Sequence, residues 1–196
     1  LSDMMVGSAV KLNIDRPEAE NKVERLKVEG LTVIDGFGIK KLDNVNFTAY
    51  SGEILGIAGI TGSGQKELLE SIAGLTSSQK DSSITYFDPK TGKSEQLCGK
   101  TPQAIRALGV GFAFVPEDRL GMGLVGNMNI PDNMMLRSYT EGISGFTNRK
   151  KPTKLAEKVV DELEVVTPDL NTPISKLSGG NVQKVLVGRE ISTHPS

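Results

Sequence analysis

The sequence predicts an α/β fold, in which strands buried in a sheet alternate with helices. The segment Ile54–Ile60 is short and apolar throughout, as expected of a strand that is covered on both faces. A glycine-rich turn follows at Thr61–Gly64, and Gln65–Leu75 then places apolar residues at helical spacing. A second apolar run, Gly111–Val115, is expected to form another buried strand. This order of strand, turn, helix and strand is typical of an α/β domain.

Two further strands are expected before the apolar run. Apolar and polar residues alternate at Leu26–Val33 and again at Val45–Ala49, and Asp35–Gly38 between them has the composition of a turn. Residues 1–22 hold few apolar side chains after Val6. They are therefore predicted to form a linker that follows the end of a preceding element.

The rest of the chain is predicted to be mainly helical. A strand is expected at Ile84–Phe87, and Thr153–Val166 repeats apolar residues every fourth position, which is typical of an amphipathic helix. The other expected helices are Pro102–Leu108, a short one around Pro131–Leu136, and Asn181–Ile191 after a Ser-Gly-Gly turn.

Composition excludes several classes of protein. The 196 residues include 23 Lys and Arg against 24 Asp and Glu, so the chain lacks the basic excess of a nucleic-acid binder. No stretch approaches the roughly 18 uninterrupted apolar residues of a membrane-spanning helix. The lone Cys98 excludes a disulfide framework and a cysteine-rich zinc site. Because acidic and basic residues balance, a nucleic-acid partner is not expected.

The pattern Gly59-x-x-Gly62-x-Gly64 lies between the predicted strand and helix, which is the context that a phosphate-binding loop requires. The full motif continues with Lys and then Ser or Thr, whereas this chain has Gln65 and Lys66. Gln65 has no charge to hold a phosphate, and Lys66 lies about 100° further around the helix, away from the axis of the loop. Tight packing of a helix on a strand also calls for glycine, so both interpretations stay open.

A second constellation, LSGGNVQK, spans Leu177–Lys184. Its Ser-Gly-Gly turn opens a helix, so free amide groups and a hydroxyl face outward from the helix N-terminus, where an anion is favoured. The alternative is an ordinary N-cap formed by Ser178 or Asn181.

Together these residues resemble the ATP-binding cassette (ABC) transporter ATPases. LSGGNVQK is similar to their signature motif, in the form typical of importers of ribose, galactose and nucleosides. The loop Gly62–Leu68 resembles the degenerate phosphate loop in the second of their two cassettes. Val115–Arg119, followed by Gly123–Val125, is similar to the segment that occupies the Q-loop position.

The resemblance implies a P-loop NTPase-like ABC cassette. It would span residues 23–196, with a helical subdomain at about 120–180, and would be incomplete at its C-terminus because the Walker B strand, the catalytic glutamate and the switch histidine follow the signature helix in this family. Residues 1–22 would be the tail of a first cassette and a linker. No catalytic residue and no metal ligand is therefore expected in the chain, and His194 is interpreted as a surface loop residue.

The family mechanism assigns roles to individual residues. Two cassettes close around ATP, so Ser178, Gly179 and Gly180 would contact the γ-phosphate of ATP held by the partner cassette. The chain's own loop would line the other site, where the binding of ATP and Mg²⁺ would be weak or absent. The residues of this loop are Gly59, Gly62, Ser63, Gly64, Gln65 and Lys66. Phe37 is the candidate for stacking on adenine, or else a hydrophobic turn residue.

Glu117, Asp118 and Arg119 are the candidates for contact with metal or with a membrane subunit, or else form a surface ion-pair cluster. The resemblance implies as partners a first cassette or second ATPase copy, transmembrane permease subunits and, indirectly, a substrate-binding protein. It places the chain peripherally, on the cytoplasmic face of the cell membrane. Two other functions stay open, a regulatory module that binds nucleotide without hydrolysis and a docking scaffold. Replacing Ser178 with Arg in an intact transporter would separate the scaffold from a working cassette.

Overall fold

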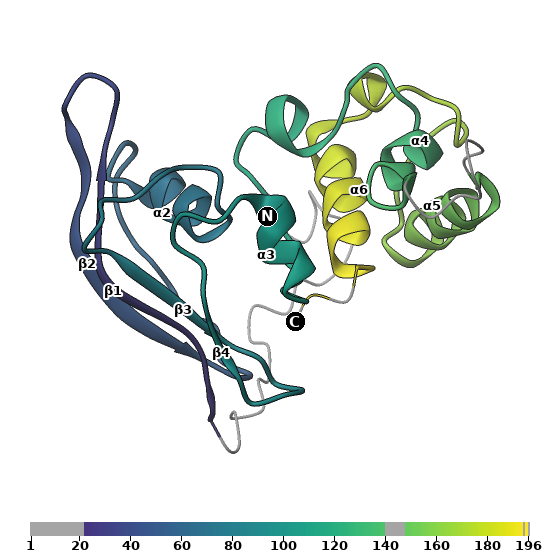
Figure 1. Ribbon diagram of the computed structural model, residues 1–196. Helices are drawn as coiled ribbons and strands as arrows, with labels where there is room; N and C mark the ends of the chain where they lie inside the picture. The colour runs from purple at the N-terminus through teal and green to yellow at the C-terminus, as the bar shows by residue number, and fades with distance from the viewer. Residues whose placement is uncertain (1–21, 140–147, 194, 196) are drawn as a thin grey trace, which may run out of the picture. The chain divides into compact units, whose positions relative to one another are not determined.

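The computed structural model describes residues 22–139, 148–193 and 195 (Figure 1). It divides into two compact units, residues 1–105 and 106–196. The predicted tail at 1–21, and His194, lie outside the described residues. The predicted boundaries at residue 23 and at about 120–180 stay predictions.

The first unit is built on an antiparallel sheet. Its strands are β1 (Glu24–Ile34), β2 (Lys40–Tyr50), β3 (Ser83–Phe87) and β4 (Ser94–Gln96), in the order β2-β1-β3-β4 (Figure 1). The strands predicted at Leu26–Val33, Val45–Ala49 and Ile84–Phe87 are confirmed. Alternate residues of β3 point into the core, and in β1 an irregularity between Val28 and Leu31 shifts the alternation by one residue. The buried side chains of the two strands are Val28, Leu31, Val33, Ile84 and Tyr86. Helix α2 (Gln65–Ile72) buries Leu68 and Ile72.

The strands expected at Ile54–Ile60 and Gly111–Val115 are wrong. The structure assigns no strand to either segment, and neither belongs to the described sheet. A strand that is apolar on both faces needs neighbours to satisfy its backbone and cover its side chains, and local pattern alone does not supply them. Without such neighbours among the described residues, Ile54 and Ile60 are 78% and 82% exposed.

The second unit is helical. It contains a π-type turn at Arg119–Gly123, then α4 (Ile130–Met135), α5 (Lys150–Glu162), a 3₁₀ turn at Ile174–Lys176 and α6 (Gly179–Ile191). Helix α3 (Pro102–Ala107) spans the boundary between the units. The three helices predicted beyond residue 130 are thus confirmed. Their apolar faces meet in one core of Leu124, Ile130, Met134, Ala156, Val159, Val165, Ile174, Val182, Val185 and Leu186.

A buried asparagine fixes the chain that enters this core. Asn133 is fully buried, and its Oδ1 accepts a hydrogen bond from the Val125 amide at 2.8 Å. Its Nδ2 donates to the carbonyl oxygens of Val125, Met128 and Asn129 at 3.0–3.3 Å. Because every polar atom of the side chain is paired, the loop before α4 is held by one residue in an apolar interior.

Candidate functional site

The phosphate-type loop has a backbone that only glycine adopts readily. Gly62 and Gly64 have φ values of 87° and 94°, and Gly64 is the N-cap of α2 with no side chain capping the helix. A Cβ on Gly64 would lie 2.5 Å from the Lys41 carbonyl oxygen and 2.7 Å from a methyl carbon of Leu42. The loop therefore packs its backbone directly on β2, and the first amide groups of α2 carry no side-chain cap.

Gln65 and Lys66, the two departures from the phosphate-loop motif, both make contacts outside the loop's centre. The Gln65 side chain folds back over Gly59, in the space that a Cβ on that glycine would need. The Lys66 ammonium lies 3.7 Å from the Glu70 carboxylate, one turn along α2, and 69% of the Lys66 side chain is exposed. Neither side chain directs a positive charge into the loop.

Phe37 lies at the tip of the β1–β2 hairpin. Asp35 builds the turn, because its Oδ1 accepts hydrogen bonds from the Phe37 and Ile39 amides at 2.9 Å each. The bond from the Ile39 amide, followed by that from Phe37 and the charge of Lys41, lowers the pKa of the Asp35 carboxyl despite an opposing effect of burial. The Phe37 side chain is 92% exposed, so this hydrogen-bonded turn presents an exposed aromatic ring.

The Ser-Gly-Gly turn opens α6. Ser178 is the N-cap, and its Oγ accepts from the Asn181 amide at 3.5 Å and from the Asn181 side chain at 2.9 Å. Asn181 Oδ1 in turn accepts from the Val166 amide at 3.0 Å. Ser178, Gly179 and Gly180 are exposed, and a Cβ on Gly180 would meet nothing within 4 Å. The cap that was the alternative interpretation is present, and it holds two exposed glycines at a helix N-terminus.

Arg119 connects the two motifs of the second unit. Its Nη1 donates to the Gly179 carbonyl oxygen at 3.3 Å. Asp118 is the N-cap of the π-type turn and accepts from the Gly121 amide at 2.8 Å, and Glu117 is exposed. No ion pair joins these three residues to one another in the described part of the chain. Asp118 forms a cap and Arg119 a brace, in place of the surface ion-pair cluster considered as the alternative.

A buried charge cluster lies at the other end of α6. The Glu190 carboxylate is fully buried and accepts from the Phe114 amide at 3.0 Å, from the Arg189 side chain at 2.9 Å and from the Arg137 side chain. Arg189 also donates to the Gly123 carbonyl oxygen at 2.7 Å. Burial lowers the pKa of the Arg189 guanidinium, and the adjacent carboxylate opposes that shift.

Sequence reasoning missed this cluster, although a signal was available. Val182, Leu186 and Glu190 are spaced four residues apart on α6, so the carboxylate continues a buried apolar stripe.

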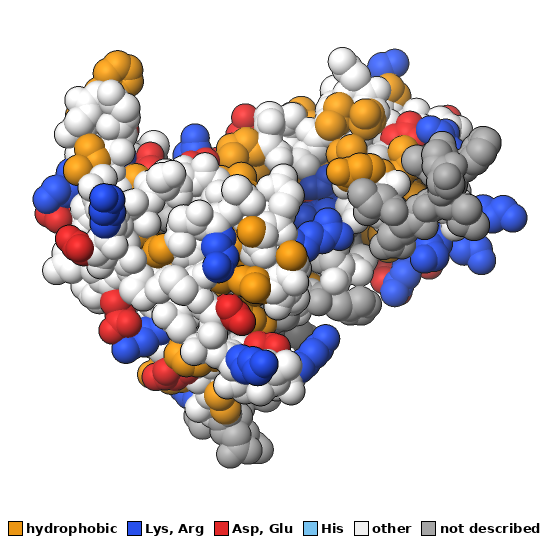
Figure 2. All heavy atoms as spheres, in the orientation of Figure 1, with side chains coloured by type: hydrophobic (Ala, Val, Ile, Leu, Met, Phe, Trp, Pro, Cys, Tyr) orange, Lys and Arg blue, Asp and Glu red, His pale blue; other side chains and the backbone are white. Residues whose placement is uncertain are grey.

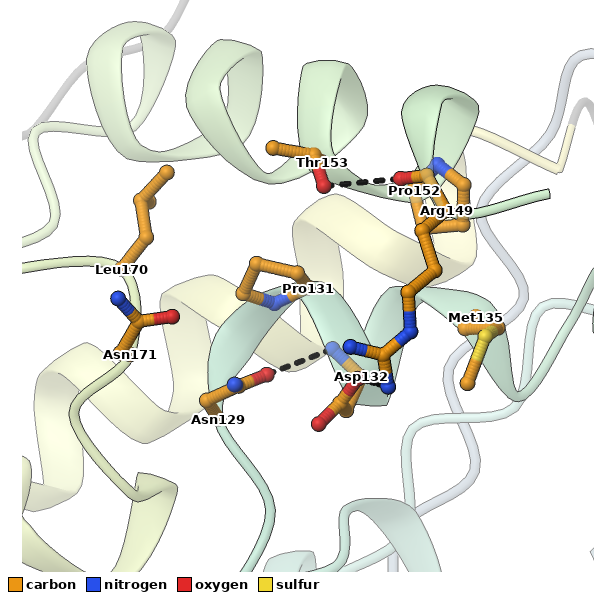
Figure 3. Close-up of a pocket in the computed structure, with 9 residues that line it drawn as sticks. All are labelled: Asn129, Pro131, Asp132, Met135, Arg149, Pro152, Thr153, Leu170 and Asn171. Carbon is orange, nitrogen blue, oxygen red and sulfur yellow. Dashed lines mark hydrogen bonds and ion pairs between the residues drawn. The ribbon is translucent and has the colours of Figure 1, made fainter. Parts of the chain in front are cut away.

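Two hollows mark the surface of the second unit. One, of about 360 Å³, is lined by residues 120–127 and Leu136. The other, of about 220 Å³, lies between α4 and α5, where Arg149 reaches across to Asp132 with an N–O distance of 3.0 Å (Figure 3).

Within the described ranges no group of three His, Cys, Asp or Glu side chains could hold a metal ion. A search of the same residues found no helix with the length and hydropathy of a membrane span.

The family model described as "ABC transporter" matches residues 42–196. The chain belongs to the ABC transporter family. The chain is 36% identical over 198 residues to the guanosine import ATP-binding protein NupO of Bacillus subtilis, covering 100% of this chain and 37% of that protein. The xylose import ATP-binding protein XylG of Thermoanaerobacter pseudethanolicus is 36% identical, with 98% of this chain and 37% of its own length covered. The galactose/methyl galactoside import ATP-binding protein MglA of Mannheimia succiniciproducens is 32% identical, with 98% and 36% covered.

Solved structures agree on the fold. The dimeric post-hydrolysis structure of the cassette MJ0796, bound to ADP and Pi, superposes with a TM-score of 0.67 at 21% identity, covering 87% of this chain and 70% of that one. The ADP conformation of MJ1267 gives a TM-score of 0.63 at 20% identity, with 88% and 66% covered. The predicted fold class, an ABC ATPase cassette of mixed α and β structure, is therefore confirmed. The chain spans little more than a third of the curated relatives that it matches.

Proposed function

We propose that the chain is part of the ATP-binding subunit of an importer for simple sugars or nucleosides. In this proposal it supplies the signature turn to ATP held by a partner cassette. The observation that carries the proposal is the exposed turn at Ser178–Gly180, which is capped by its own serine and braced through Arg119. Its relatives are named for import of guanosine, xylose and galactose.

The turn fits the terminal phosphate of ATP chemically. The first N–H groups of a helix lack partners within the helix, and the helix dipole favours an anion at this end. With no Cβ on Gly179 or Gly180, a phosphate oxygen can approach the backbone, and the Ser178 hydroxyl adds a further polar group. ATP would supply the cleavable phosphate, and these groups would bind and orient it.

The chain's own phosphate loop would bind nucleotide weakly. Its glycines leave the first turn of α2 free of side-chain caps, which suits a phosphate. Lys66, however, pairs with Glu70, and Gln65 supplies no charge, so the strongest interaction of a complete loop is missing. Mg²⁺ would also lack the hydroxyl ligand of the full motif. Phe37 would stack on adenine in this site, as its exposure permits.

The membrane subunit would contact the segment around Glu117, Asp118 and Arg119. The adjoining hollow at residues 120–127 exposes apolar side chains, because Leu120, Met122 and Val125 are each 40–47% exposed. An apolar depression beside charged side chains is a common form of protein interface. A permease helix of matching shape would fit there, and a substrate-binding protein would act through that permease.

We also propose that the chain corresponds to the second cassette of a longer polypeptide. The Gln65-Lys66 departure supports the second position, and the 37% share of the guanosine import ATP-binding protein that the chain covers supports a longer polypeptide. The partner that holds ATP would then be a first cassette of the same polypeptide. A second ATPase copy would serve equally well in chemical terms.

A chimera tests the proposal. Residues 1–196 would replace the aligned segment of the Bacillus subtilis guanosine importer, and guanosine uptake would be measured in cells that lack the native protein. We expect uptake from the chimera, its loss on Ser178→Arg, and its retention on Lys66→Ala. Full uptake by the Ser178→Arg chimera, with equal amounts of protein in the membrane, would favour a docking scaffold. A chimera that is stable and membrane-bound yet inactive, with tight Mg-ATP binding by residues 1–196 alone, would favour the regulatory module.

A further inference from the structure

The N-terminal part of α5 carries an unusual concentration of positive charge. Between residues 149 and 158 the chain has five Lys or Arg and a single acid, Glu157, although acids and bases balance over the whole sequence. We call this group the basic face; it consists of Arg149, Lys150, Lys151, Lys154 and Lys158. Figure 2 shows Lys and Arg side chains gathered over this helix.

The position of these charges opposes the helix dipole. The N-terminus of a helix carries a partial positive charge, which favours Asp and Glu there and disfavours Lys and Arg. α5 has no acid in its first turn and no side-chain cap; Glu157 lies past its middle, and Asp161 and Glu162 lie at its C-terminal end. Helix α2, by contrast, has Glu67 in its first turn. Helix stability therefore does not account for the arrangement on α5, and local rules of this kind are most often broken where a surface has a function.

The fold keeps the basic face outward. Pro152, Ala156 and Val159 are the buried residues of α5, so the opposite side of the helix faces solvent. Lys150 and Lys154 are exposed and one turn apart, a spacing at which like charges repel. Neither has an ion-pair partner within 4.0 Å in the part of the chain that the structure describes.

Two other members of the basic face lie near acids. Arg149 pairs with Asp132 of α4, and Lys158 lies 3.7 Å from Glu162. The positive charge without a nearby acid is therefore that of Lys150 and Lys154, one turn apart on α5.

We propose that the basic face binds the anionic headgroups of a phospholipid bilayer directly. The choice of a membrane as partner rests on the proposed importer function, which places the chain beside one. Each Lys or Arg near an anionic bilayer contributes a modest attraction, and several together give measurable binding. Tyr139, in the same unit, is 61% exposed, and tyrosine is favoured at membrane interfaces.

A nucleic acid fits the basic face less well. None of the residues from 148 to 162 is aromatic, so the helix offers no ring on which a base could stack.

Vesicle binding tests the inference with the 196-residue chain. The protein would be sedimented with phosphatidylcholine vesicles that contain either no phosphatidylglycerol or about 30% of this anionic lipid, at about 50 mM salt. The test variant is Lys150→Glu/Lys154→Glu. The matched control is Lys90→Glu/Lys93→Glu, which makes the same change of charge at exposed positions around the β3–β4 turn. Circular dichroism would show that both variants fold.

We expect binding only to the anionic vesicles, with a partition coefficient that falls at least about tenfold in the test variant and less than about threefold in the control. Salt at about 0.5 M should abolish it. Absence of binding to anionic vesicles, or equal loss in the two double variants, would overturn the inference. So would binding of a polyuridylate RNA, but not of vesicles, that depends on Lys150 and Lys154. None of these readouts depends on nucleotide or uptake, so failure here leaves the importer proposal standing.

Discussion

Replacing the buried carboxylate at the end of α6 offers a direct test of the packing in the second unit. Glu190→Gln keeps the size of the side chain and removes its charge. In the native structure this carboxylate accepts from the Phe114 amide, from Arg189 and from Arg137, and none of its surface is exposed. The glutamine amide would point N–H groups at some of these donors, which leaves them without an acceptor.

The magnitude follows from the environment of the two arginines. The Arg189 side chain is 7% exposed, so its charge would stay buried with no counter-ion at hydrogen-bonding distance. Removing one partner of a buried ion pair typically costs about 3–5 kcal/mol of unfolding free energy. Arg137 is 36% exposed and can regain water, which places the expected cost toward the lower end of that range.

Urea denaturation followed by far-UV circular dichroism measures the effect, since the chain has no Trp for fluorescence. With an m-value of about 2 kcal/mol/M, the expected loss moves the midpoint down by about 1.5–2 M. Glu162→Gln is the matched control, because that carboxylate is 58% exposed and 3.7 Å from Lys158, where the cost should stay below about 0.5 kcal/mol. Equal midpoints for the two variants would refute the assignment of Glu190 as the centre of a stabilising cluster.

Three further outcomes are expected. Gly64→Ala should lower the free energy of unfolding by about 1–3 kcal/mol, because the new methyl group would lie 2.5 Å from a β2 carbonyl oxygen. Gly62→Ala, which has open space around it, should lower the free energy less, and thermal melts of the two variants would measure the difference. Asp35→Asn should destabilise the β1–β2 turn at pH 7. Since the folded-state pKa of Asp35 lies below 3.8, its contribution is complete above that pH and fades as pH falls through the folded value, so the melting temperatures of variant and native chain should converge in acid. Lys66→Ala should leave Mg-ATP affinity unchanged, because its ion pair with Glu70 directs the charge away from the loop; a clear fall measured by calorimetry would contradict this.

The elements that the sequence predicts correctly are those decided by nearby residues. β1 and β2 form a hairpin around Asp35, so alternation and one turn suffice to define them. The helices beyond residue 130 show their buried faces through spacing alone. The apolar run Ile54–Ile60 is different, because a strand also needs a neighbouring strand to pair with. The residues of the run do not indicate which segment that neighbour would be. β4 is the reverse case, since its three polar residues become a strand through pairing with β3.

In the candidate site, too, contacts between residues close in sequence could be predicted and contacts between distant residues could not. The cap at Ser178 is local and could be predicted, whereas the brace from Arg119 joins residues 60 positions apart. The Glu190 cluster likewise depends on Arg137, 53 positions away. Sequence motifs therefore identify the groups that could meet a phosphate, while long-range polar contacts, which no motif records, decide how rigidly those groups are held.

These contacts give α6 a particular mechanical relation to the segment before it. At the N-terminal end of the helix, Arg119 holds the Gly179 carbonyl oxygen. At the C-terminal end, Glu190 holds the Phe114 amide and Arg189 holds the Gly123 carbonyl oxygen. The segment 114–123 is thus bonded to both ends of one helix, so a change in the tilt of α6 against this segment would strain the bond to Gly179 or the bonds of the buried Arg189 and Glu190. If a permease binds beside Arg119, as proposed, a displacement of this segment would act on the turn at Ser178–Gly180 through the Arg119 hydrogen bond and through the contacts at the other end of α6.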